Sequence, residues 1–132
     1  VRKNSRPYNC LLIQSHYGYF ICIPYRSHIR HKYSFMFKNS LRSKRAKSGL
    51  DYSKIVIVAD SNYIGQTDAI VDKDEYNETR NNIEYIKNDA QEYVDDYVNY
   101  LSGNSTKYDK KEFERIYQYS TLQYFHKELG IK

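Results

Sequence analysis

The chain has 132 residues and a mass of 15.8 kDa, which suits one domain with one hydrophobic core. No apolar run approaches the ~18 residues of a membrane-spanning helix, no signal-like leader opens the sequence, and two cysteines make no disulfide framework. These features argue against a membrane-spanning protein and a disulfide-rich secreted scaffold. They predict a cytoplasmic protein in which Cys10 and Cys22 are reduced thiols of the core.

The net charge of +5 is divided unevenly along the chain. Residues 1–54 contain twelve Lys or Arg and one acid, Asp51, whereas residues 55–132 contain nine bases and fifteen acids. The first part is therefore at +11 and the second at −6. This split predicts a positive face that binds nucleic acid, because each neutralised phosphate releases counterions. A solvated basic loop without a partner is the alternative.

Apolar runs in the first half predict strands. Residues 6–14 (RPYNCLLIQ) and 19–24 (YFICIP) are expected to form a hairpin, with Gly18 at a positive φ in the turn between them. Residues 54–59 (KIVIVA) have the strongest strand pattern in the sequence. Two further short strands are expected at 33–37 and 69–71.

The second half is expected to be helical. Asp72 with Glu75, Asn81 with Glu84, and Asp109 with Glu112 have the spacing of capping boxes. They predict one helix from 72 to about 80, a long helix from 81 to Gly103, and a third from 109 to Gly130. Most acids of this half are expected to solvate outer helix faces rather than to form a two-metal nuclease site. The sequence therefore predicts an α+β domain, with a basic, strand-rich half packed against an acidic, helical half.

The densest cluster of cations runs from Arg26 to Lys47 and contains no acid. We call residues 26–47 the basic segment, and we expect it to contact about six phosphates of an RNA. The candidate RNA-binding residues are Arg26, His28, Arg30, Lys38, Arg42, Lys44, Arg45 and Lys47 in this segment and Lys54 just after it.

Most familiar enzyme motifs are absent from the sequence: it has no glycine-rich phosphate loop, GxSxG, HExxH or CxxC. His28 and His31 have no acid or thiol beside them in the sequence, so neither a metal site nor another cofactor is expected. Cations, histidines and hydroxyls suit metal-independent RNA cleavage, in which the ribose 2′-OH attacks the adjacent phosphorus and the 5′-oxygen leaves. Histidine titrates near neutral pH, and Lys and Arg supply fixed positive charge. A loop that only binds RNA has the same composition.

Three segments of the chain are more specific. They are Arg6-Pro7-Tyr8 before an apolar strand, residues 19–32 (YFICIPYRSHIRHK) with a P-x-x-S pattern, and residues 48–54 (SGLDYSK) leading into IVIV. In this order they resemble segments of the ToxN/AbiQ family, the endoribonuclease toxins of bacterial type III toxin–antitoxin systems. The helical C-terminal half is also similar, and the branch with the CptN and TenpN toxins is most similar. Relatives carry a further strand and helix before the segment that begins here at Arg6; either that part is absent or the chain starts after it.

The resemblance implies a single domain over residues 1–132, with a compact, strongly bent antiparallel sheet like the barrel of MazF and Kid toxins and with flanking C-terminal helices. It implies a bacterial cytoplasmic enzyme that cleaves cellular RNA to a 2′,3′-cyclic phosphate. The implied partner is an antitoxin RNA, a pseudoknot cut from a repeat transcript, which inhibits the toxin in closed assemblies with equal numbers of protein and RNA molecules.

The resemblance gives this sequence four catalytic candidates. Arg6 matches its functional basic residue and Ser27 its active-site serine, while Lys32, with His31 beside it, takes the place of the lysine that follows. Three of them have a structural alternative: Ser27 as a turn cap, Arg6 as an edge-strand charge, and His31 as a surface histidine. The rival function is a non-catalytic RNA-binding module whose basic loop binds phosphates and whose tyrosines, 16 in all, stack on bases.

Overall fold

The computed structural model describes residues 10–15, 17–59 and 72–132. Five strands form one antiparallel sheet: β1 (Cys10–Gln14), β2 (Phe20–Arg26), β3 (Ser34–Met36), β4 (Gly49–Asp51) and β5 (Val56–Val58). The helices are α1 (Leu41–Ala46), α2 (Lys73–Asn81), α3 (Ile83–Leu101), α4 (Lys110–Tyr117) and α5 (His126–Leu129). The predicted α+β class and antiparallel sheet are confirmed.

Strand β2 is the centre of the sheet. It pairs with β1 along one edge, and β5 and β4 share the other edge, with Cys22 opposite Val56 and Tyr25 opposite Leu50. Between these two pairs β2 advances by three residues, whereas the segment from Leu50 to Val56 advances by six. The additional residues are accommodated in a 3-10 turn, Tyr52–Lys54. The predicted strand at 54–59 therefore begins only at Val56.

The expected barrel is not confirmed, because the sheet is not closed. Its strand order is β1-β2-β4-β3, with β5 beside β2, so β1, β3 and β5 each pair with one described strand only. β3 and β4 have three residues each, and this short ladder does not carry β3 around to β1. The 3-10 turn instead separates the part of β2 that pairs with β5 from the part that pairs with β4.

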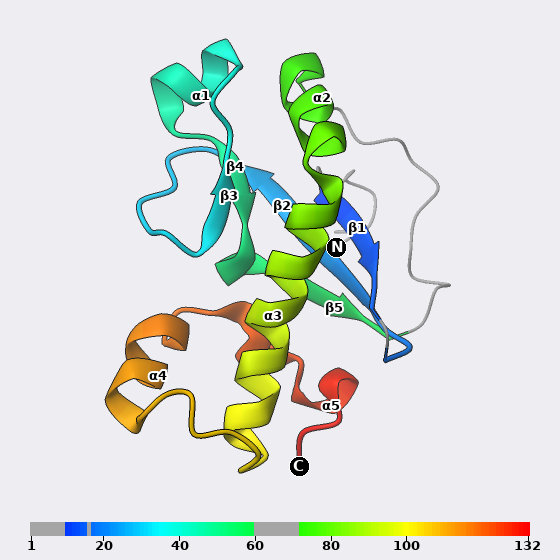
Figure 1. Cartoon of the computed structure of the whole chain (residues 1–132), viewed down its shortest axis with the longest axis vertical. Helices are drawn as coiled ribbons and strands as arrows, with labels where there is room; N and C mark the ends of the chain where they lie inside the picture. Colours follow the sequence, from blue (N-terminus) through cyan, green and yellow to red (C-terminus); the bar gives the residue numbers. More distant parts are fainter. Residues whose placement is uncertain (1–9, 16, 60–71) are drawn as a thin grey trace, which may run out of the picture.

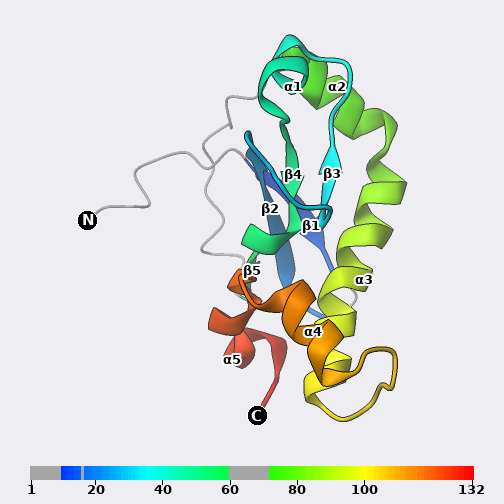
Figure 2. The same cartoon turned by 90° about the vertical axis from the view of Figure 1, so that its left-hand side faces the viewer.

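Helix α3 packs lengthwise against one face of the sheet (Figures 1 and 2). Ile21 and Ile23 of β2 share a fully buried cluster with Ile86, Ala90 and Val94 of α3. These apolar positions are two apart on the strand and three or four apart on the helix, as each element requires for a buried face. α1 lies beside α2 at one end of the molecule, and α4 and α5 lie at the other end (Figures 1 and 2).

Many of the tyrosines fill the core between α3 and α4. The rings of Tyr93 and Tyr117 lie 4.8 Å apart, those of Tyr97 and Tyr117 lie 5.1 Å apart, and the Tyr117 hydroxyl donates to the Tyr93 carbonyl. Burial raises the pKa of Tyr93 and Tyr117, which keeps both phenols neutral. Much of the unusual tyrosine content is therefore explained by packing rather than by base stacking.

Two of the three expected helix starts are confirmed. The Asp72 side chain caps α2, and Asp109 with Glu112 forms a complete capping box at the start of α4. The third expected box, at 81 and 84, is wrong. α3 begins after Asn82, whose side-chain amide donates to the Glu78 carbonyl of α2 and leaves the first turn of α3 without a side-chain cap.

The expected helix over 109–130 is interrupted. α4 ends at Tyr117, and Ser120 caps a 3-10 turn, Thr121–Tyr124, before α5 begins. The Thr121 hydroxyl donates to the Ile55 carbonyl, which ties this turn to the segment that enters β5. A tertiary hydrogen bond, which periodicity does not reveal, thus divides the helix.

The hairpin turn has Gly18 at φ 84°, as expected. Cys10 and Cys22 are half-buried thiols on the same face of neighbouring strands, and no disulfide joins them. Arg6 and the expected strand at 69–71 lie outside the described residues. Among those residues, no helix is long and apolar enough to cross a membrane.

Gly49 is expected to be irreplaceable, because β4 lies between β2 and β3. A Cβ atom there would lie 2.4 Å from the Phe35 carbonyl oxygen and 3.1 Å from Met36 Cα. Both are backbone atoms, so Gly49→Ala should lower the free energy of unfolding by ~3 kcal/mol, measured by urea denaturation. Gly18→Ala is the matched control, because open space surrounds Gly18 and only its positive φ opposes the substitution; an equal loss in both variants would contradict the prediction.

Candidate nucleic-acid interface

The turn that follows β2 is held against the C-terminal end of α1. The backbone amides of His28 and Ile29 donate to the carbonyls of Ala46 and Lys47, at 2.5 and 3.2 Å. His28 and Lys47 both have a left-handed backbone, at φ 61° and 50°, which bends the two segments toward each other. The carbonyls of Ala46, the last residue of α1, and of Lys47, its C-cap, thus both accept amide donors.

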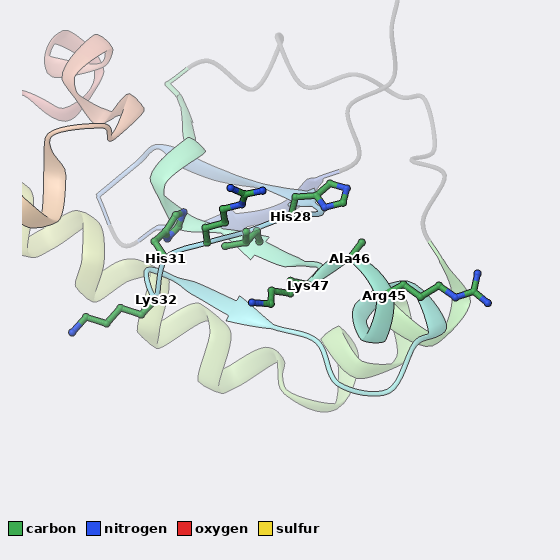
Figure 3. A pocket seen from close by; sticks show the side chains of 8 residues that line it. His28, His31, Lys32, Arg45, Ala46 and Lys47 are labelled. Atoms are coloured by element: carbon green, nitrogen blue, oxygen red, sulfur yellow. The ribbon is translucent and has the colours of Figure 1, made fainter.

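An open pocket of about 880 Å³ lies between these two segments. Six of the eight side chains that line it are basic, and the other two are Ile29 and Ala46. Figure 3 shows Lys32 and Arg45 at opposite ends of the pocket, with Lys47 between them. The six basic side chains are His28, Arg30, His31, Lys32, Arg45 and Lys47. All six lie in the predicted basic segment, so the fold gathers its two ends around one pocket.

Asp51 contacts His31, one of the side chains that line this pocket, and was not among the residues predicted for the site. Its side chain is 5% exposed, with Oδ1 3.1 Å from His31 Nε2 and Oδ2 3.6 Å from Arg26 Nε. Ser53 donates to the same Oδ1 from both its amide and its hydroxyl. The prediction that His31 has no carboxylate near it is therefore wrong in three dimensions, because β4 brings in an acid twenty residues away in sequence.

Both ring nitrogens of His31 are engaged by the protein. Nδ1 accepts from the Tyr33 amide at 3.1 Å, so the ring hydrogen of the neutral tautomer is on Nε2, which faces Asp51 and the Ser53 hydroxyl. His28, in contrast, has an exposed side chain on the pocket wall. His28 is therefore better placed than His31 to exchange a proton with a bound RNA.

The remaining catalytic candidates have different settings. Lys32 is exposed on the pocket wall, with Nζ 5.9 Å from the centre of the Tyr33 ring. Ser27 is half-buried in the turn between Arg26 and His28, and it is not a lining residue of the pocket. Arg26, an RNA-binding candidate, does not line the pocket; it pairs with Asp51, and half of its side chain is exposed.

Two acids of α2 hold the basic segment from behind. The Glu78 carboxylate accepts the backbone amides of Lys38 and Asn39, each at 3.1 Å. The Glu75 side chain is fully buried, and its Oε2 accepts the hydroxyls of Ser40 and Ser48 on either side of α1. Most acids of the second half were expected on outer helix faces; Glu75 and Glu78 are exceptions, and they fix the position of α1.

Arg42 belongs to this support rather than to the pocket. Its Nη1 lies 3.8 Å from Glu75 Oε1, an oxygen without a hydrogen-bond partner among the described residues. Arg42→Gln should therefore lower the free energy of unfolding by ~1–2 kcal/mol, because it leaves a buried carboxylate without its cation. Lys44→Gln, at an exposed position of the same helix, is expected to change it by less than ~0.5 kcal/mol. Thermal unfolding of the two variants measures the difference, and equal melting temperatures would contradict this role of Arg42.

The other predicted RNA-binding residues do not line the pocket. Lys38 and Lys44 are exposed before and on α1, and Lys54 is half-buried at the end of the 3-10 turn. The part of the chain that the structure describes has no group of three or more His, Cys, Asp or Glu that could hold a metal ion. Comparisons with protein-family models, with curated proteins and with solved structures gave no match to this chain.

Proposed function

We propose that this protein binds RNA in the basic pocket and cleaves it by transesterification from the 2′-OH, without a metal ion, as toxins of the ToxN/AbiQ type do. The observation that carries the proposal is that six basic side chains and no acid line one open pocket, while Asp51, which contacts His31, is almost completely buried. Four of these side chains, from Lys and Arg, are permanently charged, which favours a polyanion over a neutral ligand.

The pocket offers the chemical groups that this reaction uses. Lys32 would stabilise the negative charge that develops on the phosphorane or protonate the leaving 5′-oxygen. His28 would exchange protons at the pocket wall, and Ser27 would position the phosphate through its hydroxyl. The nucleophile is the 2′-OH of the RNA itself, so no side chain has to attack phosphorus. The bond from the 2′-oxygen to phosphorus forms as the bond from phosphorus to the 5′-oxygen breaks. One proton leaves the 2′-OH and one is added to the 5′-oxygen, so the reaction needs no oxidant or reductant.

The same proposal includes the wider properties that the resemblance implies. The protein would act in the bacterial cytoplasm on cellular RNA, and Arg6 would add a cation to the site. An antitoxin RNA derived from a repeat transcript would fill the same basic pocket and compete with substrate. The equal numbers of protein and RNA in the assembly follow if each RNA unit joins the pocket of one protomer to another surface of the next.

A non-catalytic RNA-binding module is the second candidate, and one observation favours it. His31 has both ring nitrogens engaged by the protein, which is the setting of a structural histidine. Base stacking on tyrosines receives less support, because none of the five tyrosines that are exposed among the described residues lines the pocket. These are Tyr17, Tyr76, Tyr85, Tyr119 and Tyr124.

Cleavage in the presence of EDTA separates the two candidates. The purified protein is incubated with structured and unstructured RNA in EDTA, and the product ends are identified by mass spectrometry. The proposal expects 2′,3′-cyclic phosphate ends, and it expects RNA with 2′-O-methyl groups to remain intact because the nucleophile is blocked. Binding of RNA without any cleavage would support the second candidate. The absence of both binding and cleavage would contradict RNA as the ligand.

A further inference from the structure

Asp51 occupies a position that connects three elements around the pocket. It is the last residue of β4, opposite Ser34 of β3, and Gly49 two residues earlier lies opposite Arg26 of β2. It is also the only acid in the first 54 residues and is almost completely buried. A buried carboxylate is costly unless cations and hydrogen bonds compensate it, so its partners indicate what the charge does.

The partners of Asp51 lie at the two ends of the turn 27–30. Oδ2 pairs with Arg26, just before this turn, and Oδ1 pairs with Nε2 of His31, just after it. The turn itself carries Ser27, His28 and Arg30, and two of these three line the pocket. The Asp51 carboxylate therefore links the two ends of the turn, which constrains the backbone that carries Ser27, His28 and Arg30.

The negative charge of Asp51 matters more for its contacts with Arg26 and His31 than for its hydrogen bond with the Ser53 amide. The amide of Ser53 donates to Oδ1 at 3.0 Å, a contact that an asparagine oxygen could also accept. Donation from His31 Nε2–H and the pairing with Arg26 are the contacts that a neutral amide would weaken. The contact with Arg26 uses Nε, so the two terminal nitrogens extend beyond it on a half-exposed side chain.

We propose that Asp51 is a positioning residue of the RNA site, which fixes Arg26 and His31 and thereby the turn 27–30 without touching RNA. This inference rests on the proposed function. RNA affinity would come mainly from Arg30, Lys32, Arg45 and Lys47, and within the described part of the chain Asp51 forms no ion pair or side-chain hydrogen bond with these four. Loss of its charge should therefore impair the geometry of reaction more than binding.

The test compares Asp51→Asn with Asp96→Asn. Asp96 is a matched control, because its carboxylate also pairs with a cation and is mostly buried, but it lies on α3 next to Lys107. D51N should lower kcat for RNA cleavage in EDTA by about 30- to 100-fold and change KM by less than about threefold. D96N should leave both constants at the wild-type values. Equal kcat in D51N and wild type would overturn the proposal.

A second readout follows His31 directly and does not need cleavage. Nitrogen-15 chemical shifts of the imidazole report its tautomer, which should be Nε2–H in the wild type and a mixture in D51N. If the wild-type protein binds RNA without cutting it, the proposed cleavage is wrong, and the tautomer still decides the role of Asp51. An unchanged Nε2–H tautomer in D51N would overturn that role.

Should D51N fail to fold, Arg26→Gln and His31→Gln replace it. Each removes one contact of Asp51 from an exposed or half-exposed side chain, and each should shift the amide resonances of residues 27–30. If both variants leave these resonances unchanged, Asp51 does not position the turn.

Discussion

RNA affinity is expected to fall by about 50-fold when the salt concentration rises from 50 to 200 mM, if the four Lys and Arg side chains of the pocket each contact one phosphate of a single strand. This corresponds to a slope of about −3 in a plot of log affinity against log salt. The sequence alone suggested about six phosphates, and the structure reduces the number because Arg42 pairs with Glu75 and Arg26 with Asp51. Fluorescence anisotropy with a labelled, 2′-O-methylated oligonucleotide measures the slope without cleavage.

A triple substitution in the pocket tests where these contacts are. Lys32→Gln, Arg45→Gln and Lys47→Gln together should weaken binding by about 100-fold at 50 mM salt and reduce the slope to about −1. The matched control removes the same charge from α4, at Lys110, Lys111 and Arg115, all exposed at the opposite end of the molecule from α1 (Figure 1). Equal losses in the two triple variants would mean that net charge, and not this pocket, binds RNA.

The second large effect is expected from Lys32→Ala, which should lower the rate of RNA cleavage by about 1,000-fold while weakening binding by less than about tenfold. The reason is that Lys32 is one of several cations for binding, whereas the developing charge on the phosphorane needs a donor at one place. Lys110→Ala, at an exposed lysine of α4, is the control and should cut at the wild-type rate. Single-turnover cleavage in EDTA and anisotropy provide the two measurements. Proportional losses in rate and affinity would assign Lys32 to binding alone.

The resemblance and the structure give Ser27 different settings. The resemblance assigns it the place of the family's active-site serine, whereas the structure places it, half-buried, in the turn beside the pocket. Ser27→Ala should lower the rate of cleavage without changing RNA affinity if the serine orients a phosphate at the edge of the pocket. An unchanged rate would leave Ser27 as a residue of the turn and would contradict the assignment.

The parts of the fold that the sequence predicts well are those with local signals. The hairpin around Gly18, the long helix α3 and the cap at Asp109 follow from alternation, helical spacing and capping residues within a few positions. α1 and β4 were missed because their signals are tertiary. Helix α1 has only six residues and is fixed by buried Glu75 of α2, and β4 has three residues between two other strands.

The same distinction holds for the candidate site. The charge count located the pocket cations correctly on one segment, because a run of Lys, Arg and His without acids is visible in the sequence. It could not show which of them the protein itself uses. Arg42 and Arg26 are paired with buried carboxylates from α2 and β4, and these pairings depend on folded contacts. Asp51, in the SGLDYSK segment, is visible in the sequence as the only acid near the cations. Its contacts with Arg26 and His31 could not be predicted without the register of β4.

The most direct test of the account is a map of RNA contacts on the folded protein. Amide and side-chain resonances are followed by NMR while a short 2′-O-methylated RNA is added, so that binding is observed without cleavage. The account predicts that the largest shifts occur at residues 28–32 and 45–47, with no shift along the acidic face of α3 at Glu92, Asp95 and Asp96. Shifts concentrated elsewhere, with the resonances of residues 28–32 and 45–47 unchanged, would contradict the central claim that the basic pocket is the RNA site.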